Sequence, residues 1–251
     1  MDSINKHCLN NIFDKIYVIH CVENEKRMNN INMQIEQSGI DLDIWWTCYH
    51  PHSDIMMNGM ILSNSAYRCS NGRELNLLRE FYGIIKTSYL RGFEKILILE
   101  DDFHLMKNEY IKDFVDNIPK DFDIIQFSIL AELNMFSVDE FEKELNNGKY
   151  FIPMKFGAWS NCGLALSRNG MKYFIDYVNK TFTAADIPIF ESTNNIPIFG
   201  NNTHNGLKHY VPTVPLIYLS SEFESQVQTR KKDDTGLYLY YNSINKDFYI
   251  I

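Results

Sequence analysis

The most informative part of this sequence is the segment KILILEDDFHL, residues Lys95 to Leu105. Residues 96–99 form a continuous aliphatic run, which is typical of a strand buried on both faces of a parallel sheet. Glu100, Asp101 and Asp102, here called the acidic triplet, follow this run without a break. Because ligands of open α/β sheets bind at the carboxyl ends of the strands, we expect the acidic triplet to line a functional site.

Strand-like and helix-like segments alternate on both sides of the acidic triplet. KIYVIH, residues 15–20, is typical of a strand, and residues 23–39 carry apolar side chains at helical spacing and close on a glycine. Residues 71–92 repeat this helical pattern, and DFDIIQFSI, residues 121–129, is again strand-like. This rhythm predicts an α/β fold with a mostly parallel central sheet covered by helices on both faces.

Composition narrows the class of protein. The chain has 251 residues, of which 45% are hydrophobic and 22% are charged, as in an ordinary globular protein. A net charge of −8 argues against a nucleic-acid-binding protein, because such a protein needs a basic face to displace counterions from phosphates. The sequence contains no repeat and no low-complexity linker, so we predict a single domain over residues 1–251.

The sequence carries no membrane-spanning or export signal. No apolar run approaches the roughly 20 residues that cross a bilayer, and residues 1–15 lack the charged-then-apolar layout of a signal peptide. These features predict a cytoplasmic protein without a transmembrane segment. The aromatic segment at residues 236–251 is expected to pack on the core, with a partner surface or peripheral membrane association as the alternative.

The acidic triplet favours a cation site. Neighbouring carboxylates resist joint ionisation unless a cation lies between them, and hard oxygen ligands suit Mn²⁺ or Mg²⁺. Strand alternation predicts that Glu100 and Asp102 point to one side of the sheet and Asp101 to the other, until the strand gives way to the loop. A solvated strand end, with an aspartate capping the next turn, is the alternative. Cys48, His50 and His52 in CYHPH, residues 48–52, are a second set of possible metal ligands, although a zinc site normally needs a fourth ligand.

The motif LILEDD resembles the acidic motif of metal-dependent glycosyltransferases with the GT-A fold. The likeness is specifically to glycosyltransferase family 25, the lipooligosaccharide and lipopolysaccharide biosynthesis group. Fragments similar to the family's motifs occur in the family's order over most of the chain. They are IYVIHCVENEKRMNNINMQIEQSGI (16–40), CSNGRELNLLREFYGIIKTSYLRGFEKILILEDD (69–102), GLALSRNGMKYFI (163–175), AADIPIF (184–190) and VPLIYLSSEFESQ (214–226).

The resemblance implies a hexosyltransferase. Such an enzyme moves a sugar from a nucleotide-sugar donor, here a UDP-sugar such as UDP-galactose or UDP-glucose, to a hydroxyl of a glycan or glycolipid acceptor. The resemblance also implies inversion at the anomeric carbon. Residues 1–130 would form the nucleotide-sugar-binding half of the domain, and residues 131–251 would form the acceptor-binding half.

The resemblance also assigns roles around the nucleotide. Asp102, together with Glu100, would hold Mn²⁺ or Mg²⁺ and so neutralise the departing diphosphate. Glu100 or Asp101 would assist at the metal or the ribose. Arg27 lies near the carboxyl end of the first strand and is expected to contact the diphosphate, with a plain surface arginine as the alternative. His20 is expected near the nucleotide, with a packed strand residue as the alternative.

A single carboxylate in AADIPIF is the candidate catalytic base. Asp186 precedes Pro188, so it belongs to a loop or a helix N-cap. In the functional interpretation Asp186 removes the acceptor proton, and in the structural one it only caps a helix. Glu191 is the next candidate for the base. His204 and His209 are weaker candidates for a further metal ligand.

Two other classes of protein remain open. A metal-dependent phosphohydrolase also uses a carboxylate cluster after an aliphatic strand, and Asp101 or a neighbouring carboxylate would then activate water or attack phosphorus. A catalytically inactive binding protein on the same fold is the second alternative. It fits two departures from the family pattern: a Ser-His pair is replaced near Arg79 and Glu80, and an Asp-Gly pair is absent from CYHPHS.

Overall fold

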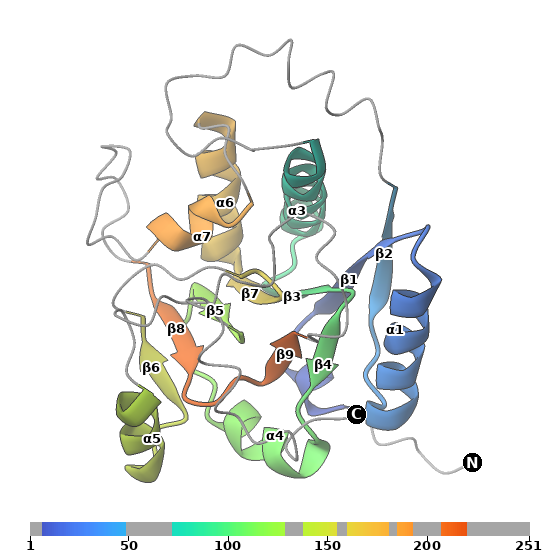
Figure 1. Cartoon of the computed structure of the whole chain (residues 1–251). Helices are drawn as coiled ribbons and strands as arrows, with labels where there is room; N and C mark the ends of the chain where they lie inside the picture. The colour runs from blue at the N-terminus through green and yellow to red at the C-terminus, as the bar shows by residue number, and fades with distance from the viewer. Residues whose placement is uncertain are drawn as a thin grey trace.

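The computed structural model describes residues 7–48, 72–128, 138–154, 160–180, 185–192 and 207–219. A seven-stranded sheet in the order β2-β1-β3-β7-β5-β8-β6 forms the centre of the molecule (Figure 1). Strands β4 and β9 pair separately as a two-stranded sheet. The strands are β1 (Lys15–Cys21), β2 (Asp43–Thr47), β3 (Lys95–Glu100), β4 (Phe103–Leu105), β5 (Ile124–Gln126), β6 (Phe151–Pro153), β7 (Gly163–Ser167), β8 (His209–Pro212) and β9 (Ile217–Leu219).

Most strands of the large sheet run in one direction. Strand β1 is parallel to both β2 and β3, and β5 is parallel to β8. Strand β7 lies antiparallel between β3 and β5, and β6 lies antiparallel beside β8. Because β7 reverses between them, β5 and β8 point the same way as β1, β2 and β3. The predicted mostly parallel sheet is therefore confirmed, with β6 and β7 as the reversed strands.

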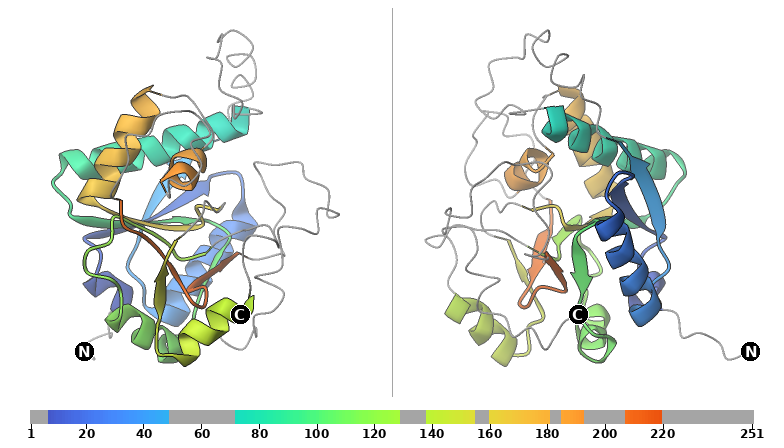
Figure 2. Two further views of the ribbon diagram at one scale, coloured as in Figure 1. Left: turned by 90° about the vertical axis from the view of Figure 1, so that its left-hand side faces the viewer. Right: turned by 45° about the vertical axis from the view of Figure 1, so that its right-hand side comes forward.

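Helices cover both faces of this sheet (Figure 2). Helices α1 (Glu25–Ser38) and α4 (Asn108–Asp116) pack on one face, and α3 (Gly72–Leu90) and α6 (Arg168–Lys180) pack on the other. The short helix α7 (Ile187–Glu191) lies on the α3 and α6 face, and α5 (Val138–Asn146) packs beside β6 and β8. The predicted α/β fold with helices on both faces is confirmed. A 3₁₀ helix, Cys8–Asn11, precedes β1.

Strand β3 lies at the centre of the packing. Leu97 and Leu99 point into the core under α1 and α4, whereas Ile96 and Ile98 point into the core under α3 and α6, and all four are fully buried. This explains the continuous aliphatic run, because a central strand meets apolar side chains on both faces. The strand ends at Glu100, so the acidic triplet begins at the carboxyl edge of the sheet.

The helix ends follow the glycines of the sequence. Gly39 closes α1 with φ of 70° and donates its N–H to the carbonyl of Ile35, and Gly92 follows α3 with φ of 81°. Left-handed backbone at these positions favours glycine. Of the helices in the described ranges, none combines the length and the apolar character needed to cross a bilayer. Residues 49–52 and 236–251 lie outside the described ranges.

Candidate active site

The acidic triplet lies where three segments meet. Glu100 ends β3, its N–H donates to the carbonyl of Cys162 at 3.2 Å, and Asp101 and Asp102 form the turn into β4. Strand β1 runs beside β3 and brings His20 to the same edge, as expected for neighbouring parallel strands. The edge therefore gathers side chains that are far apart in the sequence.

Asp101 is held by two partners. His20 donates through Nδ1 to Oδ2 of Asp101 at 2.8 Å, and Arg27 donates through Nη1 to Oδ1. All three side chains are buried. Burial disfavours the charged carboxylate, but the hydrogen bond from His20 and the charge of Arg27 outweigh burial and lower the pKa of Asp101. Asp101 is therefore an ionised, fixed anchor of the turn.

Arg27 is also paired with the next carboxylate. Its Nη2 lies 3.2 Å from Oδ2 of Asp102, and the arginine is only 4% exposed. The predicted alternation applies only as far as the strand continues, and β3 ends at Glu100, so the turn that follows lets both aspartates reach Arg27. The predicted contact of Arg27 with a diphosphate stays a prediction. Among the described residues, its guanidinium contacts these two carboxylates.

A polar stripe on α1 holds this turn. The helix begins at Asn24, whose side chain accepts from the N–H of Arg27 at 3.1 Å. Asn30 and Gln34 follow at helical spacing on the same face. Asn30 donates to the carbonyl of Phe103 at 2.9 Å, and Gln34 accepts from the N–H of Leu105 at 2.9 Å. Helix α1 thus fixes the turn and β4 through buried polar side chains.

Glu100 and Asp102 are less well neutralised than Asp101. Burial, followed by the charges of Asp102 and Asp186, raises the pKa of Glu100 well above its ordinary value. Burial likewise raises the pKa of Asp102 to about 6, although Arg27 partly opposes this. Oδ1 of Asp102 is buried and has no hydrogen-bond partner within the described ranges. These two carboxylates therefore favour either a proton or a nearby cation.

Asp186, the residue before α7, lies near enough to Glu100 for its charge to help raise the pKa of Glu100. It precedes the first residue of α7 but makes no side-chain cap hydrogen bond, so the alternative that Asp186 caps this helix is not supported. Ile187 and Ile189 anchor α7 in the core, and the hydroxyl of Tyr173 donates to the carbonyl of Pro188 at 2.7 Å. Packing therefore fixes Asp186.

The donor set suits a hard cation that also binds phosphate. Across the described part of the chain, no three His, Cys, Asp or Glu side chains are grouped so as to enclose a metal. Magnesium commonly takes one or two carboxylates and completes its shell with substrate phosphates and water. Glu100 and the unpartnered Oδ1 of Asp102 match that pattern. The residues present therefore fit Mn²⁺ or Mg²⁺ brought together with a diphosphate.

Other predicted candidates lie elsewhere or are engaged. His209 begins β8, opposite the carboxyl edge, and its Nδ1 lies 2.9 Å from Oγ of Ser192. Burial lowers the pKa of His209 to about 3. The hydroxyl of Tyr177 donates to Glu191 at 2.6 Å, which leaves Glu191 less suited to accept an acceptor proton. His204 lies outside the described residues.

Sequence reasoning missed two residues at this edge. Trp46, at the carboxyl end of β2, is 56% exposed, and its ring meets that of His20 edge to face at 5.4 Å. A tryptophan near the end of a strand was the available signal. Asn161, just before β7, is 1% exposed and has no hydrogen-bond partner for its amide nitrogen or oxygen among the described residues. No local pattern in the sequence marks Asn161.

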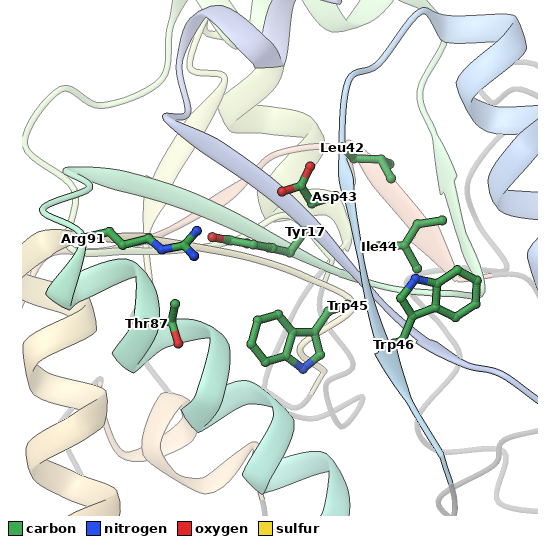
Figure 3. Close-up of a pocket in the computed structure, with 8 residues that line it drawn as sticks. All are labelled: Tyr17, Leu42, Asp43, Ile44, Trp45, Trp46, Thr87 and Arg91. Carbon is green, nitrogen blue, oxygen red and sulfur yellow. The ribbon is translucent and has the colours of Figure 1, made fainter.

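A shallow hollow lies along β2, on the side that faces α3 (Figure 3). Asp43 and Trp45 point to one side of β2, whereas Ile44 and Trp46 point to the other. Arg91, at the end of α3, borders the hollow. This hollow reaches toward the amino end of β2, away from the acidic triplet. We place the candidate active site at the triplet, because ligands of such sheets bind at the carboxyl edge.

Comparison with known proteins identifies no family. No protein-family model matches the chain, and no curated protein matches it. Among solved structures, a glycosyltransferase involved in glycosylation of the major capsid of PBCV-1 matches with 10% identity and a TM-score of 0.32, over 64% of this chain and 63% of that chain. Mouse xyloside xylosyltransferase 1, apo form, matches with 8% identity and a TM-score of 0.36, over 74% and 80%. A197 from STIV matches with 8% identity and a TM-score of 0.39, over 86% and 100%. Likenesses this weak carry no argument about activity, so the functional argument rests on the side chains.

Proposed function

We propose that this protein is a metal-dependent glycosyltransferase. It would move a sugar from a nucleotide-sugar donor, with a UDP-sugar such as UDP-galactose or UDP-glucose as the first candidate, to a hydroxyl of a glycan or glycolipid acceptor. The main observation in support of this proposal is that the three carboxylates of the acidic triplet are neutralised to different degrees. Asp101 is fixed by His20 and Arg27, whereas Glu100 and Asp102 keep raised pKa values beside Asp186.

The donor would bind at Glu100 and Asp102. A divalent cation bound there with the diphosphate neutralises charge on the leaving group. Arg27 and His20 hold the turn in place, because their contacts with Asp101 fix the backbone that carries Asp102. His20 and Arg27 thus act on the nucleotide site through Asp101 and Asp102.

Trp46 offers a stacking surface for the nucleotide base. Its ring is more than half exposed and is buttressed by His20, which in turn contacts Asp101. Base stacking on an aromatic ring contributes about 1–3 kcal/mol. A base on Trp46 and a diphosphate at Asp102 would place the donor along the carboxyl ends of β1, β2 and β3. This supports a nucleotide-sugar-binding half within residues 1–130.

Asp186 would remove the acceptor proton. The acceptor hydroxyl must lose its proton as the new bond forms, and a positioned carboxylate takes it. Asp186 reaches the cluster from α7, a different element from those that hold the donor, as an acceptor-side base requires. With donor and base approaching from different elements, we propose inversion at the anomeric carbon.

The alternatives fit the geometry less well. A phosphohydrolase that uses Asp101 needs an accessible carboxylate oxygen, but both oxygens of Asp101 are bound to buried partners. A catalytically inactive binding protein would keep the donor site and give Asp186 no chemical task. Substitution of Asp186 therefore separates the enzyme from a binding protein.

A screen of nucleotide sugars for metal-dependent thermal stabilisation tests the proposal. A ligand that binds only the folded protein raises its melting temperature by mass action. We expect one donor to stabilise the protein with Mn²⁺ and much less with a chelator, and to release nucleoside diphosphate when a glycan acceptor is added. Asp176→Asn, at an exposed ion pair on α6, is the matched control. Release of phosphate from simple phosphoesters, without sugar transfer, would favour the phosphohydrolase.

A further inference from the structure

We propose that the side-chain amide of Asn161 binds hydroxyl groups of the sugar that the donor carries. This inference rests on the proposed function and assigns a sugar-recognising residue to the same site. It also predicts that Asn161 acts on the sugar and leaves the nucleotide contacts unchanged.

Asn161 lies beside the acidic triplet. Strands β3 and β7 are antiparallel, and Leu99 pairs with Gly163. The pairing continues for one more position, where the N–H of Glu100 donates to the carbonyl of Cys162. Asn161 follows at the next position, across from Asp101. The charges of Asp102 and Glu100 reach this segment, since they add to the effect of burial in raising the pKa of Cys162.

The backbone before Asn161 is held in an unusual conformation. Ser160 has φ of 91°, which L-residues with a side chain rarely adopt. Two hydrogen bonds maintain it: Gln126 donates to the carbonyl of Ser160 at 2.8 Å, and Ser160 Oγ accepts from the N–H of Cys162 at 3.3 Å. Strained backbone of this kind persists where the surroundings enforce it and is concentrated at functional sites.

The amide of Asn161 is buried and unused. It is 1% exposed, and neither Oδ1 nor Nδ2 has a hydrogen-bond partner in the described ranges. Buried polar groups are normally paired, because an unpaired one loses its hydration without compensation. By contrast, Asn30 is similarly buried but donates through Nδ2 to the carbonyl of Phe103, so only its Oδ1 lacks a partner in the described ranges. Asn161 thus differs from a structural asparagine of the same protein.

Hydroxyl groups are the ligand chemistry that fits this amide. An amide both donates and accepts, and a sugar hydroxyl does the same, so one hydroxyl pair satisfies Nδ2 and Oδ1 together. A bare anion leaves Oδ1 unpaired and lies close to Glu100 and Asp102. Glu100 and Asp186 are both partly exposed, so the cluster is open to solvent on their side.

Paired leucine substitutions test this inference. In Asn161→Leu a side chain of similar size replaces an unused amide, so we expect the melting temperature of the unliganded protein to rise. In Asn30→Leu the hydrogen bond to the carbonyl of Phe103 is lost, so we expect the melting temperature to fall. Asn161→Ala is the second variant if leucine does not fit. An Asn161→Leu protein that is destabilised as strongly as Asn30→Leu would overturn the inference, because Asn161 would then be a bonded structural residue.

The second readout compares ligands with and without sugar. UDP, UDP-glucose and UDP-galactose are titrated with Mn²⁺ into the wild-type protein, Asn161→Leu and Asn161→Ala. We expect the UDP affinity to stay unchanged and the nucleotide-sugar affinity to fall about tenfold, as for one lost hydrogen bond. An unchanged nucleotide-sugar affinity in both variants overturns the inference and leaves the proposed function intact. Absence of any nucleotide binding by the wild-type protein overturns both.

Discussion

The two sides of the acidic triplet are built differently. On the α1 side, Asp101 is enclosed by His20 and Arg27, and Arg27 also reaches Asp102. On the β7 and α7 side, no ion pair with Glu100 is formed within the described residues, and Asn161 has no hydrogen-bond partner there. Asp101 and Arg27 on the α1 side are paired without a ligand, whereas on the other side Glu100 has no ion pair and Asn161 has no hydrogen bond in the described part of the chain. The difference separates residues that hold the site from residues that meet a ligand.

The energetics of the two sides differ in the same way. A buried ion pair adds little net stability over apolar packing, but loss of one partner is strongly destabilising because a charge is left buried. Unpaired buried groups instead reduce stability as long as no ligand is present. We therefore expect substitutions on the α1 side to damage folding, and substitutions on the β7 and α7 side to damage function while sparing folding.

The largest effect is expected on the α1 side. Arg27→Met removes the only cation that contacts both Asp101 and Asp102 in the described structure, so it should lower the free energy of unfolding by about 3–5 kcal/mol. Urea denaturation measures this change. Lys26→Met, at the exposed neighbouring position, removes the same charge and should change stability by less than about 0.5 kcal/mol. Equal, small effects of the two variants would show that the α1 side does not hold the fold.

Asp186→Asn should separate chemistry from stability. Loss of the base should lower the transfer rate by about 10²–10⁴-fold. The melting temperature should stay near that of the wild type, because the side chain of Asp186 makes no capping hydrogen bond that the substitution could remove. Steady-state transfer, donor affinity and melting temperature are measured together, with Asp176→Asn as the control. Near-wild-type transfer by Asp186→Asn would assign the base to another group, and Glu191→Gln is then the next variant.

Asp102 gives a pH-dependent test of the unneutralised carboxylates. Its pKa of about 6 in the folded protein exceeds the ordinary aspartate value of 3.8. In this window the folded protein binds a proton that the unfolded chain releases, so stability due to Asp102 is full below about pH 4 and is lost as the pH rises through 6. The wild-type protein should therefore gain up to about 1.4 kcal/mol per pH unit over Asp102→Asn as the pH falls from 6 to 4.

The comparison for Asp102 needs metal-free buffer with a chelator, and urea unfolding at pH 7.5, 6, 5 and 4. Subtraction of the two curves removes the opposite contribution of His209, whose pKa is lowered by burial. Parallel curves for the wild type and Asp102→Asn would mean that Arg27 already neutralises Asp102 fully, which contradicts the proposed need for a cation.

The smallest effect is expected at the adjacent tryptophans, which face opposite sides of β2. Trp46→Ala should weaken donor binding about tenfold through lost stacking, with little change in stability, because the ring is 56% exposed. Trp45→Ala should destabilise the fold, because this ring is partly buried and its Nε1 donates to Glu80 at 2.6 Å. Weaker donor binding by Trp45→Ala alone would move the donor to the hollow of Figure 3.

Local patterns predicted the elements but not their partners. The aliphatic run of β3 and the glycines after α1 and α3 follow from periodicity and backbone preference, so the fold class and the position of the acidic triplet were predictable. The reversal of β7 was not, because the apolar pattern of a strand does not encode its direction. Membership of glycosyltransferase family 25, the single-domain prediction and the assigned ligand roles stay predictions.

The site itself depends on contacts between distant segments. The position of Arg27 near the carboxyl end of the first strand suggested a contact with the diphosphate, but in the structure the side chain contacts Asp101 and Asp102. Asn161 was missed for a related reason: a missing hydrogen bond is a property of the packed protein and leaves no trace in the local sequence.

Calorimetry of nucleotide binding tests the central claim most directly. UDP is titrated into the wild-type protein, Asp102→Asn and Asp186→Asn, each with Mn²⁺ and with a chelator. We predict metal-dependent binding by the wild-type protein and Asp186→Asn, and loss of the metal dependence in Asp102→Asn, because an amide keeps the shape of the carboxylate but not its charge. Equal affinity of the wild-type protein for UDP with Mn²⁺ and with chelator would contradict the claim that the unneutralised side of the acidic triplet binds a metal and a diphosphate.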